Sequence, residues 1–228
     1  MKQSYDYWLK KTIFISFTLI TLCISYSNNF FFAANQNWYQ NFQLDSEQVV
    51  LDGILHDGET IQLGRYERPQ VTDQTKKAHE LFEEKNQSGN FNVYKSQFGL
   101  QVKIFNFLNK SWDLDISSLK IITAFLMSVV LTGILLTIHR DFSIKSSIAL
   151  YFLFLLSPWL IAFSNNLYWI SFSWFLPLLV SAFFAPLIYK NSYIFIIYLV
   201  ILFFAYIFKF LSGYEYITTI VLSSAIPI

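Results

Sequence analysis

Two carboxylates, Asp45 and Glu47, flank one serine directly after the first long apolar stretch of the chain. Two acidic side chains at such a position could bind a divalent cation together, or one of them could act as a general base that takes the proton from an attacking hydroxyl. The pair also fits a structural interpretation, because an Asp that caps a helix and a Glu in its first turn stabilise any helix. On the spacing alone, the structural interpretation is favoured.

Two arginines and one Lys–Glu pair are candidates for binding a charged substrate. Arg65 and Arg68 suit a phosphate, since a guanidinium offers paired hydrogen-bond donors, but they could equally pair with Glu67 or with anionic lipid headgroups. Lys209 and Glu215 lie near the ends of two apolar stretches. Ionisable groups at membrane depth are costly and often functional, although Lys209 could snorkel towards water and Glu215 could cap a helix.

Asp52, His56 and Asp57 form the nearest approach to a metal-binding pattern. Asp52 and His56 are one helical turn apart, which permits shared ligation of a metal ion. A histidine near a helix C-terminus followed by an Asp-Gly turn gives the same pattern without any metal. The metal ligands therefore stay unknown at this point, and a divalent cation is a possible cofactor.

The composition indicates a membrane protein. Hydrophobic residues make up 54% of the 228 residues and charged residues 14%, against about 25% charged in an ordinary soluble domain. The formal net charge of +1 argues against a nucleic-acid partner. The single cysteine, Cys23, excludes an intramolecular disulfide and a thiolate metal cluster.

Charge-free gaps predict six membrane-spanning helices, because a bilayer core of about 30 Å needs about 20 apolar residues. The helices are expected within 12–34, within 121–138, as two segments between Lys145 and Lys190 divided at 164–166, within 191–208, and from 216 onwards. The last stretch, 216–228, is too short to cross the bilayer. We expect it either to be re-entrant or to belong to a longer polytopic protein.

The distribution of cations predicts the orientation of these helices. If the spans alternate, the cations of the N terminus and of the short loops share one side: Lys2, Lys10, Lys11, Arg140, Lys145 and Lys190. The positive-inside rule then predicts a cytoplasmic N terminus in a cell membrane, and we expect the bacterial inner membrane. A cleavable signal peptide is the alternative for the first helix, but several later spans favour an uncleaved one.

The predicted fold class is all-α, a polytopic helical membrane protein in three parts. These are an N-terminal transmembrane helix in 1–34, an extracytoplasmic loop in 35–119 and transmembrane helices two to six in 120–228. Within the loop we expect a helix from Asp45 to about His56, a polar solvent-facing helix in 72–85 and an amphipathic helix along the membrane surface. The apolar face of that last helix carries Phe98, Val102, Phe105 and Leu108, with Trp112 as its anchor.

This organisation resembles the polytopic glycosyltransferases of the GT-C class, which use sugars linked to a lipid phosphate. The segment Asp45-Ser46-Glu47 stands where those enzymes carry variants of an Asp-x-Asp motif. The stretch 94–100 is similar to a Tyr-x-Ser segment near the end of the same loop. The likeness covers an amino-terminal part only, because such enzymes commonly have about twice as many spans.

The resemblance implies transfer of a sugar from a polyprenyl-phosphate donor to an acceptor at the outer face of the membrane. Asp45 would be the base and Glu47 would assist it or a metal ion. The departing phosphate and the substrate would be bound by Arg65, Arg68, Lys209 and Glu215. The implied partners are the lipid bilayer and the lipid-linked sugar.

Two other interpretations stay open on the sequence. One is a non-enzymatic membrane protein, such as half of a transporter or an assembly component of an envelope polysaccharide system, for which Pro158 and Pro177 are candidate kinks. It ranks second because the polar residues concentrate outside the spans. The other is a truncated, inactive remnant of either class.

Overall fold

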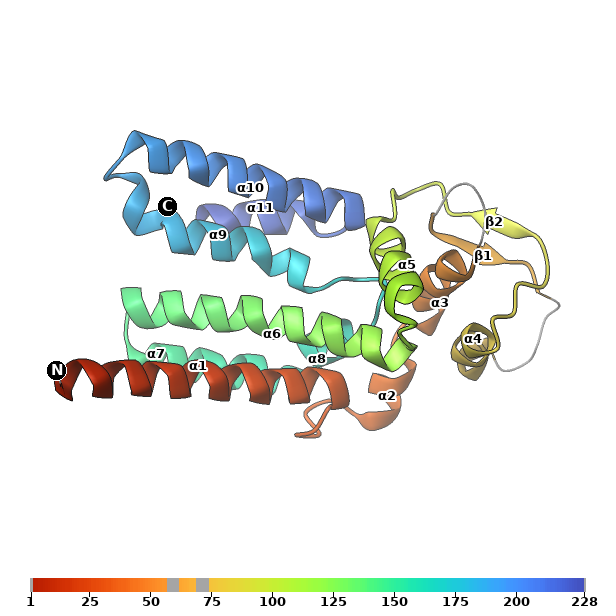
Figure 1. Cartoon of the computed structure of the whole chain (residues 1–228), viewed down its shortest axis with the longest axis horizontal. Helices are drawn as coiled ribbons and strands as arrows, with labels where there is room; N and C mark the ends of the chain where they lie inside the picture. The colour runs from red at the N-terminus through yellow and green to blue at the C-terminus, as the bar shows by residue number, and fades with distance from the viewer. Residues whose placement is uncertain (1, 57–61, 69–73, 228) are drawn as a thin grey trace.

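The computed structural model describes residues 2–56, 62–68 and 74–227 and shows a helical bundle with a small mixed insert at one end (Figure 1). Within the described residues, seven helices form the bundle, and all but the short 158–164 helix run along its long axis. They are α1 (Lys2–Asn28), α6 (Ile116–Asp141), α7 (Ile144–Leu155), α8 (Pro158–Ser164), α9 (Phe172–Ile188), α10 (Ser192–Ser212) and α11 (Ile217–Ala225). The predicted all-helical bundle is confirmed at this level.

The insert between α1 and α6 lies at the end of the bundle opposite the N terminus (Figure 1). It contains α2 (Gln36–Asn41), α3 (Leu44–Leu55), β1 (Gly64–Tyr66), α4 (Gln74–Glu83), β2 (Phe91–Val93) and α5 (Leu100–Trp112). The two strands pair antiparallel, with Arg65 opposite Asn92. The sequence pattern does not predict this sheet, because three-residue strands are too short to show an alternating pattern.

Three helical stretches are long and apolar enough to cross a membrane within the described residues: Trp8–Asn28, Ile116–Asp141 and Ser192–Ser212. A fourth results if α7 and α8, which are bent by 61° relative to each other, count as one broken span. The helix α9 is apolar but shorter, with 17 residues. Several spans therefore agree with the prediction, whereas their number of six stays a prediction.

The break between α7 and α8 follows from Pro158, which the sequence analysis named as a kink site. Proline has no N–H to donate to the carbonyl four residues earlier, so Phe154 O loses its helical partner. Tyr26 OH of α1 donates to that oxygen at 3.0 Å, and Ser25 Oγ donates to Leu155 O at 3.1 Å. The neighbouring helix thus satisfies the backbone that the break exposes, as a low-dielectric surrounding requires.

A second proline is compensated in the same way near the other end of the bundle. Pro186 lies inside α9 and cannot donate to Ala182 O. The guanidinium of Arg140 donates to that carbonyl at 2.7 Å and to Phe183 O at 3.3 Å. Arg140, which the sequence presented as a loop cation, therefore also joins α6 to α9.

The helix α6 is the centre of the bundle and packs against α1, α7 and α9. Its buried side chains, Met127 and Leu131 among them, form one core with Leu22 and Tyr26 of α1. The contact with α9 is close at Gly133, where an added Cβ would lie 2.9 Å from Leu179 Cδ1. In contrast, α10 exposes a row of large apolar side chains, as expected of a helix that faces lipid: Phe195, Ile196, Leu199, Val200, Phe203 and Phe204.

For two insert helices, the structure contradicts the predicted exposed face. The helix α4 is not solvent-facing throughout, because Leu81 and Phe82 are buried. The helix α5 turns its apolar stripe into the insert, where Val102 and Phe105 are 0% and 3% exposed, while Phe98 is 49% exposed. Helical periodicity identifies an apolar stripe, but the protein core and the membrane surface compete to cover it.

Candidate functional site

The helix α3 presents the two predicted carboxylates in opposite ways. It begins at Leu44 after Gln43, whose backbone is left-handed with φ 46°, so Asp45 lies in the first turn and is not the cap. Asp45 is exposed, whereas Glu47 is 1% exposed. Residues two apart on a helix do not face each other. The pair is therefore divided between the surface and the interior.

Glu47 is the centre of a buried ionic cluster. Its Oε2 lies 2.8 Å from His79 Nε2 of α4 and 3.0 Å from Lys120 Nζ of α6. Its Oε1 accepts a hydrogen bond of 3.0 Å from the amide of Leu167, in the turn between α8 and α9. One carboxylate thus joins four parts of the chain: α3, α4, α6 and the 165–171 turn.

Electrostatics keep Glu47 ionised. Burial by itself would raise the pKa of Glu47, because the charged form loses its hydration. Lys120, His79 and the donated amide outweigh this effect, and the pKa of Glu47 lies below its ordinary value. Neither basic partner of Glu47 is evident from the sequence. In the sequence, His79 lies within the polar 72–85 segment and Lys120 directly precedes an apolar stretch, and neither position indicates a contact with Glu47.

The start of α3 is clamped to the bundle by polar contacts of the 165–171 turn. Asn166 Nδ2 donates to Phe42 O at 2.9 Å and to Gln43 O at 3.0 Å. Trp169 Nε1 donates to Gln43 Oε1 at 2.8 Å. Asp45 therefore lies between two fixed points, residues 42 and 43 before it and Glu47 after it.

The two predicted arginines have different surroundings. Arg65 is exposed on β1 and donates to Gln48 Oε1 at 2.8 Å. Arg68 is largely buried and forms a two-pronged ion pair with Asp52, with N–O distances of 3.0 and 2.9 Å. It also donates to Asn86 O at 3.0 Å. Arg68 therefore stabilises the insert, whereas Arg65 has an accessible guanidinium.

Asp52 and His56 do not face a common position where a metal ion could bind. Asp52 accepts from Arg68 and from the amide of Tyr66, whereas His56 stacks on Phe91 with ring centroids 3.9 Å apart. Asp57 lies outside the described residues. Within the described part of the chain, no three His, Cys, Asp or Glu side chains are grouped so that they could hold a metal ion.

Lys209 and Glu215 join the α10–α11 corner to the insert. Lys209 is 1% exposed and donates to Gly213 O. Glu215 accepts hydrogen bonds from Gln97 Nε2 and, at 3.2 Å, from Tyr168 OH. Burial and the charge of Glu215 raise the pKa of Tyr168. Gln97 belongs to the 94–100 stretch singled out in the sequence, so this stretch lies against the ends of the spans.

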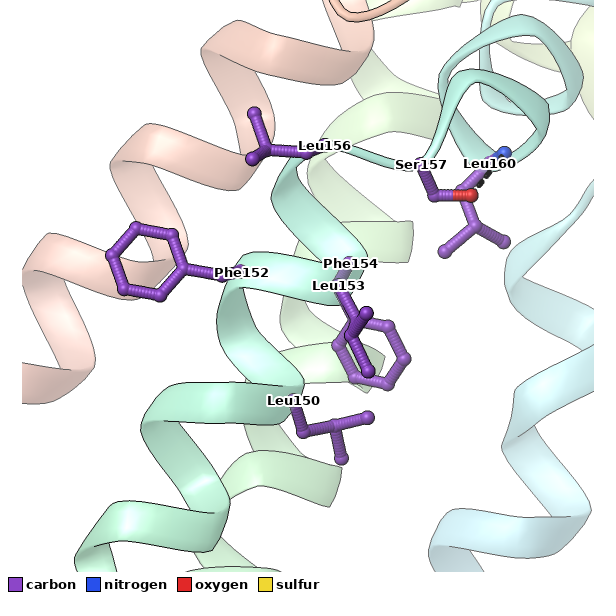
Figure 2. A pocket seen from close by; sticks show the side chains of 7 residues that line it. All are labelled: Leu150, Phe152, Leu153, Phe154, Leu156, Ser157 and Leu160. Carbon is purple, nitrogen blue, oxygen red and sulfur yellow. Dashed lines mark hydrogen bonds between the residues drawn. The ribbon is translucent and has the colours of Figure 1, made fainter.

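An apolar pocket lies apart from these charged groups, at the break between α7 and α8 (Figure 2). It is lined by Leu150, Phe152, Leu153, Phe154, Leu156, Ser157 and Leu160. Its polar group, Ser157 Oγ, already accepts from the amide of Leu160 at 3.4 Å. The pocket therefore offers packing for apolar groups and no group for acid–base chemistry.

The candidate site is thus the junction between the insert and the bundle. There α3 carries the exposed carboxylate of Asp45 and the buried Glu47, and the exposed guanidinium of Arg65 on β1 contacts Gln48 of the same helix. No protein-family description, curated protein or solved structure matches the chain. The inference about function therefore depends on the residues and geometry of this junction.

Proposed function

We propose that the chain is a glycosyltransferase-like membrane protein that transfers a sugar from a lipid-phosphate-linked donor to an acceptor at the insert side of the membrane. The observation that supports this most is the exposed Asp45 carboxylate on a backbone clamped to the end of a membrane bundle. A general base needs an accessible carboxylate in a fixed position close to the acceptor hydroxyl.

Asp45 is the carboxylate available for this role. Among the described residues, its side chain forms no hydrogen bond or ion pair. Glu47 has three donors on its two oxygens and is shielded from solvent. We therefore assign proton transfer to Asp45 and a positioning role to Glu47, which holds α3 against the bundle.

Arg65 is the best placed group for the departing phosphate. Its contact residue Gln48 lies three residues after Asp45, and residues at this spacing are neighbours on a helix. Arg68 and Lys209 already donate hydrogen bonds to Asp52 and to Gly213 O, respectively. They would support the site through the fold, as would Glu215 at the α10–α11 corner. A divalent cation would need oxygen ligands from the substrate in addition to Asp45.

The proposed orientation places the insert outside the cell. The ends of α6 and α9 and the starts of α7 and α10 lie at the end of the bundle opposite the insert (Figure 1). Arg140, Lys145 and Lys190 belong to these connections. The positive-inside rule favours the cytoplasm for that end and the outer surface for the insert.

The proposal is tested with membranes that contain the chain and a radiolabelled polyprenyl-phosphate-linked sugar. Asp45→Asn should reduce transfer at least about 100-fold, because general-base catalysis contributes about that much or more. Ser46→Ala, a change at the neighbouring position, should keep the rate. Full transfer by Asp45→Asn would rule out the base role.

A further inference from the structure

The outward face of α5 is the surface left without a role by the proposed function. Because Val102 and Phe105 pack into the insert core beside α3, the opposite side of α5 is open. Lys103 is exposed there, and Phe107 and Trp112 are 65% and 63% exposed. Phe98, directly before the helix, adds a further exposed ring. Large aromatic side chains that are this exposed indicate a surface that binds a partner protein or a membrane.

The exposed groups are arranged as mixed aromatic and cationic contacts. Lys103 Nζ lies 4.2 Å from the centre of the Phe98 ring. The rings of Phe107 and Trp112 meet edge to face with centroids 6.3 Å apart. Aromatic rings beside a lysine are the composition of helices that lie in the interface of a bilayer, with rings at the headgroup level and the ammonium beside lipid phosphate.

The position of α5 in the fold fits that partner. It lies across the end of the bundle and packs against α10 (Figure 1). After Trp112 the chain enters α6 at Ile116. Both α6 and α10 are apolar enough to span a membrane. The outward face of α5 therefore lies at the height where α6 and α10 would emerge from the hydrocarbon core of the bilayer.

The two acidic residues that follow α5 have partners within the protein. Asp113 lies 3.9 Å from Lys85 Nζ. Asp115 caps α6 by accepting from the amide of Ser118 at 2.8 Å. Each of these carboxylates thus has a contact within the protein, and Lys103 supplies a cationic group on the α5 face.

We propose that the α5 face, defined by Phe98, Lys103, Phe107 and Trp112, rests on the headgroup layer of the bilayer that holds the spans. The rings enter the boundary between headgroups and acyl chains, and the Lys103 ammonium binds a lipid phosphate. This contact fixes the insert against the membrane surface and sets the height of its other groups above the lipid. It is independent of the proposed enzymatic function.

The test uses the full chain with Cys23→Ser, so that single cysteines can carry a fluorescent label. Ser111→Cys places the label on the exposed side of α5, one turn from Phe107. Ser88→Cys, at another exposed serine in the connection between α4 and β2, is the matched control. Both proteins are reconstituted in phosphatidylcholine vesicles with and without lipid that carries a nitroxide on its headgroup.

Quenching by the nitroxide should be at least several-fold stronger for the label at 111 than for the label at 88. Lys103→Gln should weaken the quenching at 111, whereas Lys103→Arg, which keeps the charge, should preserve it. Equal quenching at the two positions would overturn the proposal. A label at 111 that is shielded from aqueous quenchers but not reached by the lipid nitroxide would indicate a protein partner and would also overturn it.

Discussion

The buried cluster around Glu47 allows a sharp prediction for Glu47→Gln. The substitution keeps the shape of the side chain but removes its charge. Lys120, whose side chain is 13% exposed, then loses the carboxylate 3.0 Å from its ammonium. Breaking one partner of a buried ion pair costs about 3–5 kcal/mol, because the other charge stays desolvated without compensation. The folding equilibrium should fall by roughly two to three and a half orders of magnitude.

The measurement is the free energy of unfolding of the full chain in detergent, obtained from denaturant titration. Asp45→Asn is the matched control, since it neutralises an exposed carboxylate two residues away on the same helix. It should cost no more than about 1 kcal/mol, the size of a charge effect in the first turn of a helix. Adding Lys120→Met to Glu47→Gln should recover much of the loss, because the unpaired ammonium is removed as well.

Two outcomes would refute this reasoning. If Glu47→Gln and Asp45→Asn lowered the free energy of unfolding equally, burial of Glu47 would not determine how much its charge stabilises the fold. A double variant no more stable than Glu47→Gln alone would mean that the charge of Lys120 is not the source of the cost.

Three further predictions concern Glu47, Arg68 and Tyr26. The pKa of Glu47 is lowered in the fold, so its stabilising contribution is complete above the ordinary carboxyl pKa of about 4.3 and is lost as the pH falls through the lower folded value. In an acid titration followed by circular dichroism, the stability of Glu47→Gln should depend less on pH than that of the unchanged protein. Arg68→Lys cannot keep the two-pronged contact with Asp52, and limited proteolysis should cut the insert faster than in the unchanged protein. Tyr26→Phe leaves Phe154 O without its donor and should lower the free energy of unfolding by about 1–3 kcal/mol.

The local patterns of the sequence predicted much of the fold. Helical spacing from Asp45 to His56 corresponds to α3, which ends at Leu55 with His56 as its C-cap. The missing N–H of Pro158 predicted a kink, and α8 begins at that residue after a sharp bend. Such features depend on neighbours a few residues away, which a sequence displays directly.

The candidate site depended on contacts that no local pattern reveals. His79 and Lys120 reach Glu47 from helices far along the chain. Spacing within the Asp45–Glu47 segment does not show which carboxylate will be covered, because that depends on where the 165–171 turn docks. Likewise, tertiary packing determines that the apolar stripe of α5 is buried in the insert core, and periodicity alone does not specify what covers such a stripe.

The division of labour between Asp45 and Glu47 is tested most directly by measuring sugar transfer and thermal unfolding together for Asp45→Asn. If Asp45 is an exposed general base, the variant should have a melting temperature close to that of the unchanged protein and a sugar-transfer rate at least about 100-fold lower. A variant that melts normally and transfers at the full rate would contradict the central assignment.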